Sequence, residues 1–148
     1  MAHDRLIGTE DGLPWDIPEE YNQYLRRVSG KTVIMGRQTY ELVGRDLTSR
    51  YTIVVSSDFP PGNYVVCKDV DEALRQAESL GEDIFIAGGA KIYAQTINKA
   101  DMMYLTYIEG EFKGVAYFPV FSEREWEVVD SEKYTDYTIV TYRRKQIY

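Results

Sequence analysis

The chain has 148 residues, the size of one compact domain, and 44% of them are hydrophobic. Its formal net charge of −7 argues against a protein that coats nucleic acid or binds acidic membranes, because both need a basic surface. One cysteine, Cys67, and one histidine, His3, exclude an intrachain disulfide and a metal site built from these residue types. No apolar run approaches the roughly 18 residues of a membrane-spanning helix, and the start lacks the layout of a signal peptide, so we expect a cytoplasmic protein.

Helices and short apolar strands alternate over the first two-thirds of the chain. Residues 1–17 are rich in glycine and proline, and we expect them to be irregular. Pro18 suits the first position of a helix and acids follow it, so we predict a helix over about 18–28 that Gly30 ends. Asp69 with Glu72 resembles a capping box for a helix that runs to about residue 80. The remaining predicted elements are strands over 32–35, 53–56, 64–67 and 84–87, helices over 38–43 and from the glycines at 88–89 to about 97, and a turn at 60–62.

The last third of the chain is predicted to be antiparallel. We expect a strand over 102–108 and a long hairpin over 125–148 that turns near Thr135-Asp136, because apolar and polar residues alternate there. Strands that alternate with helices, as in the earlier part, indicate a mostly parallel sheet flanked by helices. We therefore predict a single α/β domain over residues 1–148, with three layers and the hairpin at one edge of the sheet.

One local pattern, a buried strand followed by glycine and the start of a helix, occurs at residues 33–39 and again at 84–91. Glycine lets backbone N–H groups approach a ligand closely, and a helix N-terminus favours an anion. Arg37, Thr39 and Lys91 add donors that suit phosphate. Because ligands bind at the carboxyl ends of strands in open α/β sheets, two such ends indicate a ligand with more than one phosphate, such as a dinucleotide. A plain turn is the alternative for each glycine taken alone.

Glu20 is a second candidate for chemistry. An acid in the first turn of a helix ordinarily balances the helix dipole, which explains Glu20 without any function. The functional alternative is that Trp15, Tyr21 and Tyr24 surround it with a partly apolar pocket. A carboxylate in such a pocket would have a raised pKa and could pair with the amidine-like edge of a heterocycle.

A series of different short motifs extends over nearly the whole chain, from Asp4 to the terminal hairpin. They are Ile7-Gly8, Leu13-Pro14-Trp15, Pro18, Glu20, residues 33–39, Ser56-Ser57, Gly88-Gly89 with Tyr93, Leu105-Thr106 and Phe118-Pro119. In this order and spacing they resemble the dihydrofolate reductase family. The resemblance implies that family's three-layer α/β fold, and reduction of 7,8-dihydrofolate to 5,6,7,8-tetrahydrofolate by hydride transfer from NADPH to pterin C6, with N5 protonated from water.

The resemblance also implies which residues bind the substrate. Glu20 would bind the 2-amino and N3 edge of the pterin, and Thr106 would support it through a hydrogen bond; with Trp15 these form the implied catalytic set. Arg50 would pair with the α-carboxylate of the glutamate tail, although the pattern alone favours a solvated surface arginine. The implied wall of the cleft is Tyr21, Tyr24, Val43 and Leu47, positions that the pattern alone would assign to the core. Tyr24 stands where phenylalanine is frequent, so its extra hydroxyl needs a partner or water.

For the cofactor, the resemblance implies NADPH. Arg37 and Ser57 match the pocket for its 2′-phosphate, Gly88-Gly89 matches a cis peptide bond, and residues 8–15 match a mobile loop that closes over the nicotinamide. The full set implied to bind NADPH is Ile7, Leu13, Gly36, Arg37, Gln38, Thr39, Ser56, Ser57, Gly88, Gly89, Ala90, Lys91, Ile92 and Tyr93. No metal is expected.

Three positions depart from the family's pattern. The family has an apolar strand, in the middle of its sheet, before the segment that matches Ala2-His3-Asp4, so we expect a divided sheet unless another segment or a second chain fills the gap. Val115 stands where relatives often carry an acid that holds the closed loop, so closure should be weaker or arranged differently. Gln38 replaces a frequently basic neighbour of Arg37, which should soften the preference for NADPH.

Three functions therefore stay open. NADPH-dependent reduction of dihydrofolate leads, because Glu20 and Arg50 occur together. The others are reduction of another pterin or of a pyrimidine on the same fold, like the riboflavin-pathway reductases, and folate or NADPH binding with little or no catalysis. The expected partners are dihydrofolate and antifolates, without nucleic acid or membrane, and we expect a monomer unless a second chain completes the sheet.

Overall fold

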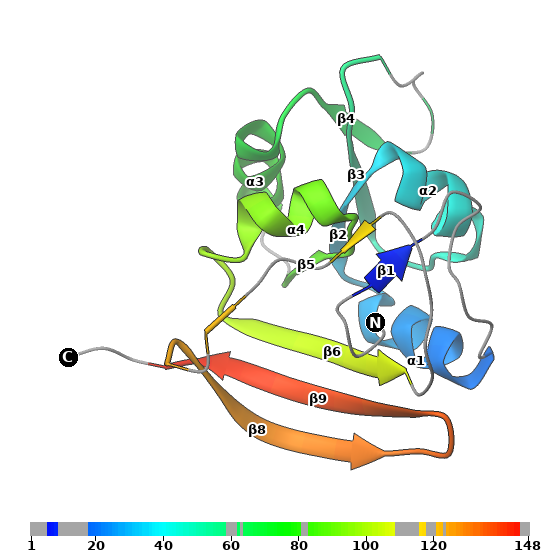
Figure 1. The fold of residues 1–148 in the computed structure, drawn as a ribbon. Helices are drawn as coiled ribbons and strands as arrows, with labels where there is room; N and C mark the ends of the chain where they lie inside the picture. The colour runs from blue at the N-terminus through cyan, green and yellow to red at the C-terminus, as the bar shows by residue number, and fades with distance from the viewer. Residues whose placement is uncertain are drawn as a thin grey trace. The chain divides into compact units, whose positions relative to one another are not determined.

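A computed structural model describes residues 6–8, 18–58, 62, 64–80, 83–108, 116–117, 121–122 and 124–145. The chain divides into two compact units. We call Pro18–Thr96 the parallel-sheet unit, and Met1–Ile17 together with Ile97–Tyr148 the antiparallel-sheet unit. Figure 1 shows their helices and strands. None of the helices in the described part of the chain has the length and apolarity to cross a membrane.

The parallel-sheet unit is built on four parallel strands in the order β4-β3-β2-β5. These are β2 (Thr32–Gly36), β3 (Tyr51–Val55), β4 (Val65–Cys67) and β5 (Ile84–Ile86). Ile34 of β2 pairs with Ile53 on one side and with Ile86 on the other. Val33, Ile34 and Met35 are fully buried, because a central parallel strand is covered on both faces.

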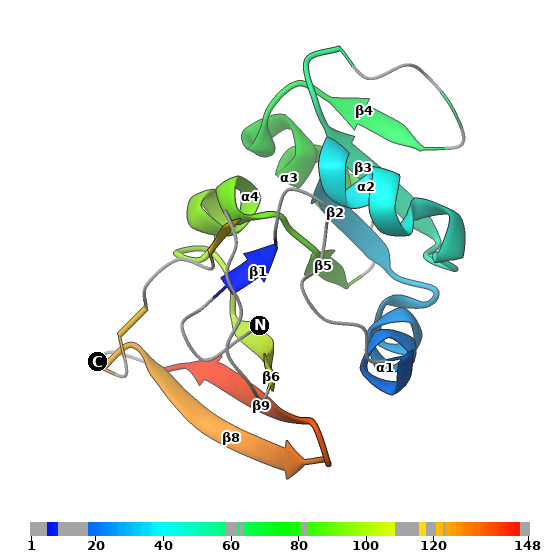
Figure 2. The ribbon, with the colours of Figure 1, turned by 45° about the vertical axis from the view of Figure 1, so that its right-hand side comes forward.

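Helices cover both faces of this sheet. They are α1 (Pro18–Val28), α2 (Arg37–Val43), a short 3-10 helix η1 (Gly44–Asp46), α3 (Val70–Ser79) and α4 (Ala90–Thr96). Ala73 and Ala77 of α3 pack with Ile34 on one face. Val28 of α1 packs with Val33 and Met35 on the other face, where α2 also lies (Figure 2). Neighbouring residues of β2 therefore serve opposite layers, which is the three-layer arrangement that the sequence predicts.

The start of α3 follows the predicted cap. The Asp69 carboxylate accepts a hydrogen bond from the Glu72 backbone N–H at 2.8 Å. The Glu72 carboxylate in turn accepts one from the backbone N–H of Lys68, at 3.4 Å, so the return bond goes to the residue before the cap. These bonds satisfy backbone donors at the first turn and fix where α3 begins.

The antiparallel-sheet unit contains β6 (Met102–Ile108), β8 (Trp126–Lys133) and β9 (Tyr137–Arg144), in the order β6-β9-β8. The predicted hairpin turn is confirmed: the Tyr134 N–H donates to the Tyr137 carbonyl at 2.8 Å, and the two rings stack with centroids 4.6 Å apart. The hairpin pairs with β6 through β9, so that among the described residues β6, β9 and β8 form one antiparallel sheet. In the described part of the chain, the parallel and the antiparallel strands belong to different sheets.

Residues 1–17 are not wholly irregular. Leu6–Gly8 form β1, which pairs antiparallel with β7 (Ala116–Tyr117). The expectation failed here because a three-residue strand has no periodicity of its own and its partner is far away in the sequence. The described residues do not include the predicted loop residues 9–15, nor Pro60, Pro61, Val115, Phe118 and Pro119.

Candidate active site

Two glycine turns meet at the carboxyl ends of β2 and β5. The Gly36 N–H donates to the Gly88 carbonyl at 2.8 Å, and the Gly88-Gly89 peptide bond is cis, as the resemblance implies. The turns are adjacent because β2 and β5 are neighbouring parallel strands. A Cβ built on Gly36 would lie 3.5 Å from Ile92 Cγ1, and one on Gly89 would lie 3.7 Å from the Thr39 hydroxyl. The predicted residues of the two turns are thus brought together in one place.

The helix α2, which follows the first turn, begins without a capping side chain. Gly36 is the N-cap of α2 and makes no side-chain capping hydrogen bond. Gln38 is exposed on α2, and Lys91 is exposed in the first turn of α4, beside Ala90. The backbone donors of α2 and the Lys91 ammonium suit an anionic ligand, which is the role predicted for them.

Arg37 lies in an exposed network of acids and hydroxyls. Its guanidinium contacts the Glu41 carboxylate at 2.9 Å and the Asp58 carboxylate at 3.5 Å, and the Ser56 hydroxyl donates to Asp58 at 3.1 Å. The hydrogen bond to Glu41, followed by the charges of Glu41 and Asp58, raises the pKa of Arg37. Ser57 is exposed next to Ser56. Sequence reasoning missed both acids; Glu41 could have been found from its place four residues after Arg37 on one helix.

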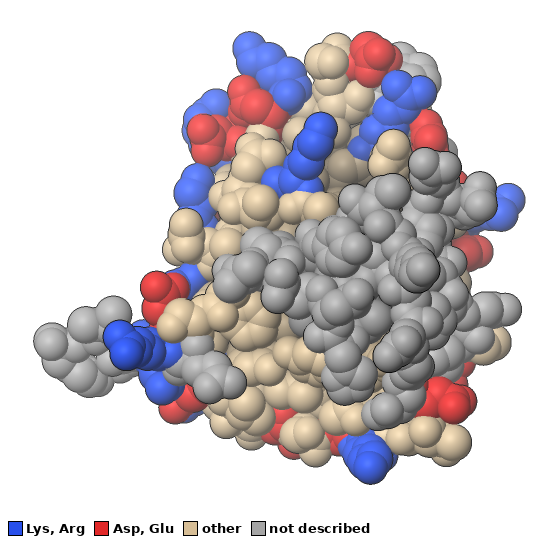
Figure 3. Space-filling model, viewed as in Figure 1, with Lys and Arg blue, Asp and Glu red and all other residues tan. Residues whose placement is uncertain are grey.

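Positive and negative side chains are interspersed on the described surface of the face in Figure 3. Arg37 is therefore one of several cations that lie near acids on the surface. Its distinction is its position directly after Gly36, at the end of β2.

Glu20, Tyr24 and Tyr93 form a group of ionisable side chains inside the parallel-sheet unit. Glu20 is half-buried on α1, and Tyr24 follows it by one helical turn. Burial, and then the charge of Glu20, raise the pKa of Tyr24 to about 12. Burial also raises the pKa of Tyr93 of α4, with further contributions from Tyr24 and Glu20. The three side chains are therefore within electrostatic reach of one another.

Tyr93 connects this group to the second glycine turn. A Cβ built on Gly88 would lie 3.3 Å from the Tyr93 ring, so the ring rests directly against the turn. The Tyr93 backbone N–H donates to the Gly89 carbonyl at 2.9 Å. The predicted carboxylate on α1 and the predicted phosphate-binding turn thus belong to one cluster of contacts.

The predicted wall residues lie beside the same group. Tyr24, Val43 and Leu47 are partly buried and pack against the cluster of Val28, Val33 and Met35. The core interpretation and the cleft interpretation of these positions are therefore compatible: one side of each residue packs and part of it stays accessible. The Tyr21 hydroxyl donates to the Asp46 carboxylate at 2.6 Å, and burial followed by this bond raises the pKa of Tyr21.

Arg50 is exposed at the start of β3, with its guanidinium 5.5 Å from the centroid of the Tyr51 ring. Thr106 is half-buried on β6, in the antiparallel-sheet unit, so its hydrogen bond to Glu20 stays a prediction. The backbone of Ile7 lies in β1. Leu13 and Trp15 lie outside the described residues.

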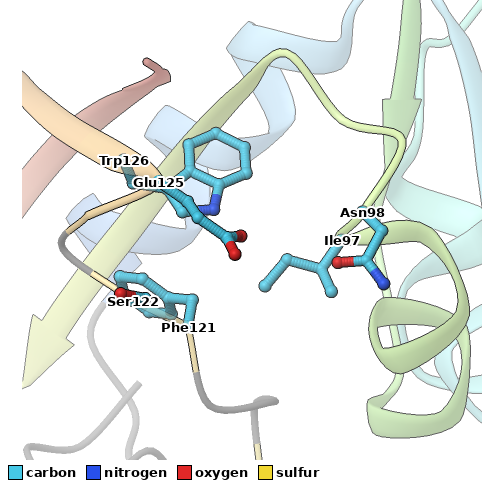
Figure 4. Close-up of a pocket in the computed structure, with 6 residues that line it drawn as sticks. All are labelled: Ile97, Asn98, Phe121, Ser122, Glu125 and Trp126. Carbon is cyan, nitrogen blue, oxygen red and sulfur yellow. The ribbon is translucent and has the colours of Figure 1, made fainter. Parts of the chain in front are cut away.

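A hollow of about 450 Å³ lies in the antiparallel-sheet unit, and none of its lining residues is a predicted site residue. Figure 4 shows the Glu125 carboxylate directed into it. Its lining residues are Ile97, Asn98, Phe121, Ser122, Glu125 and Trp126. Beside it, the Arg144 guanidinium lies 4.5 Å from the Trp126 ring centroid and donates to the Ala100 carbonyl at 2.9 Å. Within the described residues, no group of three or more acids, histidines and cysteines is placed to hold a metal ion.

Comparison with known proteins identifies relatives over most of the chain. The family model for dihydrofolate reductase matches residues 1–145. Dihydrofolate reductase of Staphylococcus aureus (strain MSSA476) is 38% identical over 133 residues, which cover 88% of this chain and 82% of the relative. The enzyme of Bacillus subtilis (strain 168) is 36% identical over 154 aligned residues, covering 98% of this chain and 91% of the relative.

A solved structure agrees with these matches. The dihydrofolate reductase from Enterococcus faecalis complexed with NADP(H) and RAB-propyl superposes with a TM-score of 0.87 at 28% identity, over 99% of this chain and 93% of that one. The α/β fold, the oxidoreductase activity and the cofactor NADPH implied by the sequence are thereby confirmed. The chain belongs to the dihydrofolate reductase family and reduces dihydrofolate with NADPH.

Proposed function

We propose that Glu20 is the carboxylate that holds the pterin and that the two glycine turns hold the cofactor beside it. The observation that carries this proposal is the position of Tyr93. Its ring lies against Gly88 of the second turn, and its hydroxyl is within electrostatic reach of Glu20 on α1. Substrate and cofactor must lie next to each other for hydride transfer, and this arrangement supports such neighbouring sites.

The cofactor fits the residues at the turns. Adding a Cβ at Gly36 or Gly89 would fill space next to the backbone, and the first turn of α2 has no capping side chain. Thr39, Ala90 and Lys91 would hold the pyrophosphate, and Arg37 with Ser57 the 2′-phosphate. When bound there, NADPH supplies the hydride. A phosphate beside Arg37 would compete with Asp58, whose carboxylate is 3.5 Å from the guanidinium, for the same donor.

The carboxylate of Glu20 would accept hydrogen bonds from the 2-amino and N3 edge of the pterin. Its negative charge favours the form of the substrate that is protonated at N5, and water delivers that proton, because the group beside N3 is too far from N5. Hydride transfer to C6 then gives tetrahydrofolate and NADP⁺. Tyr24, Val43 and Leu47 would exclude water from one side of the ring, and Arg50 would bind the glutamate tail.

The finer expectations on partners and assembly belong to the same proposal. Antifolates would bind at Glu20 in place of the pterin. We further propose that the chain acts as a single-domain monomer in the cytoplasm; a family match over residues 1–145 and a single buried cysteine, Cys67, support this. Light scattering of the purified chain would show a mass near 17.1 kDa for a monomer and twice that for a dimer.

The role of Glu20 is tested by steady-state oxidation of NADPH with Glu20→Gln and its matched control, Glu19→Gln. Both residues are acids in the first turn of α1 and interact similarly with the helix dipole, but Glu19 is exposed. We expect Glu20→Gln to lower kcat/KM for dihydrofolate about 100-fold or more at neutral pH while NADPH still binds. Glu19→Gln should leave it unchanged. Equal, small effects of the two substitutions would show that Glu20 only balances the helix.

A further inference from the structure

The hydroxyl of Tyr24 is fully buried and has no hydrogen-bond partner among the described residues. Only the Thr32 hydroxyl shares this property in that part of the chain. A buried hydroxyl without a partner is unfavourable, because it loses its hydrogen bonds to water and gains none in return. Phenylalanine would fill the same space without that penalty, so the hydroxyl of Tyr24 needs an explanation.

The position of Tyr24 indicates where a partner would come from. It follows Glu20 by one turn of α1, and residues four apart on a helix lie on the same face. Its ring packs against Val28, Val33 and Met35, which hold it in place. An ionised Tyr24 would raise the pKa of Tyr93, the residue that rests against the Gly88 turn, so the two side chains lie within electrostatic reach. The hydroxyl thus lies in the group that connects the proposed pterin carboxylate to the proposed cofactor turn.

The hydroxyl is a donor throughout the physiological pH range. Burial, and then the charge of Glu20, raise its pKa to about 12, so it stays protonated. A carboxylate accepts hydrogen bonds from N–H groups of a heterocycle. A neutral hydroxyl beside it can donate a hydrogen bond to a nearby acceptor on the same heterocycle, either a ring nitrogen or a carbonyl oxygen.

We propose that the Tyr24 hydroxyl is a specificity-determining group that donates a hydrogen bond to an acceptor atom on the heterocycle of the bound substrate. This inference rests on the proposed function of Glu20. It assigns the bond to the heterocycle and not to the glutamate tail, because Tyr24 lies with Glu20 and Tyr93. A site built to pair such an acceptor discriminates against rings that lack it, since the hydroxyl is then left without a partner.

Tyr24→Phe removes the hydroxyl alone and tests the inference. Dissociation constants would be measured by fluorescence titration for dihydrofolate, for a dihydropterin without a tail, and for NADPH. We expect Tyr24→Phe to raise the dissociation constants of dihydrofolate and of the dihydropterin equally, by about tenfold, because one hydrogen bond is lost. Binding of NADPH should be unchanged. The ligand-free variant should be at least as stable as the wild type, because it loses no hydrogen bond.

Tyr40→Phe is the matched control. Tyr40 borders the same apolar cluster and its ring packs on Tyr64, with centroids 4.8 Å apart, but it is outside the proposed site. It should leave all three dissociation constants unchanged. Unchanged binding in Tyr24→Phe, or weakening of dihydrofolate alone, would overturn the inference.

Glu20→Gln separates this failure from a failure of the proposed function. If Glu20→Gln weakens the dihydropterin and Tyr24→Phe does not, only the inference about Tyr24 is wrong. If neither substitution affects the dihydropterin, both the proposed role of Glu20 and the inference built on it are wrong.

Discussion

The two units of this chain use their strands differently. In the parallel-sheet unit, β2 is covered by helices on both faces, and Val33, Ile34 and Met35 are fully buried in succession. In the antiparallel-sheet unit, burial alternates: Met103 is buried on β6, whereas Met102 is 42% exposed. The outer strand β8 is more exposed still, with Val128 at 58%.

This difference explains why most of the predicted ligand-binding residues lie in the parallel-sheet unit. A parallel strand cannot turn back directly, so β2 and β5 are each followed by a glycine turn that leads into a helix, and a hydrogen bond joins the two turns. We propose that their backbone groups share one ligand. Antiparallel strands reverse through a tight hairpin, and their contacts run along the whole strand. Most of the predicted ligand residues with described side chains lie in Pro18–Thr96, whereas Thr106, on β6, belongs to the other unit.

The largest expected effect is a difference between the two sheets in how much a substitution lowers the free energy of unfolding. Ile34→Ala removes a fully buried side chain at the centre of the parallel sheet and should lower the free energy of unfolding by about 2–5 kcal/mol. Val128→Ala, on the exposed edge strand β8, should change it by about 0.5 kcal/mol or less. Chemical denaturation of both variants measures the difference. Similar losses would show that the two sheets are buried to the same degree.

The next effect separates a turn that binds ligand from one that only ends a helix. Gly88 has a φ of +109°, and a Cβ at this position would lie against Tyr93. Gly88→Ala should therefore lower the free energy of unfolding by about 1–3 kcal/mol and weaken the binding of NADPH. Gly30 also has a positive φ, +73°, but open space around it, and it lies at the end of α1. Gly30→Ala should lower stability and leave the NADPH dissociation constant as it is. An equal loss of NADPH affinity in both would remove the special role of the Gly88 turn.

The smallest effect concerns the choice of cofactor. Arg37→Ala should narrow the preference for NADPH over NADH about tenfold, because the charge-assisted hydrogen bond to the 2′-phosphate is lost. Arg143 is a matched arginine of the other unit, paired with Glu127 at 2.7 Å on neighbouring strands. Arg143→Ala should not change the ratio of the kcat/KM values for the two cofactors. A ratio that Arg37→Ala leaves unchanged would place the 2′-phosphate elsewhere.

Local signals predicted most elements of the chain. Pro18 and the acids after it mark the start of α1, Asp69 caps α3, and continuous apolar runs mark β2 and β3. Each of these signals lies within a few residues of the element that it specifies. The predicted proximity of the two glycine turns also held, because parallel strands place their carboxyl ends at one edge of a sheet.

What failed depends on distant partners. The pairing of β1 with β7 joins Leu6 to Tyr117, which are far apart in the sequence, and neither strand is long enough to show a period. For the site, the pattern predicted Glu20 and Arg37, and helical spacing could have added Glu41. The contact of Arg37 with Asp58 and the buried hydroxyl of Tyr24 follow only from packing in three dimensions.

The central claim, that Glu20 favours the substrate protonated at N5, is tested most directly by the pH dependence of single-turnover hydride transfer in the wild type and in Glu20→Gln. Protonated substrate is needed, so the wild-type rate should fall as the pH rises through the apparent pKa of the complex. Without the carboxylate charge that pKa should be lower, so Glu20→Gln should lose more rate at pH 7 than at pH 5. A profile with the same apparent pKa in both proteins would contradict the assignment of Glu20.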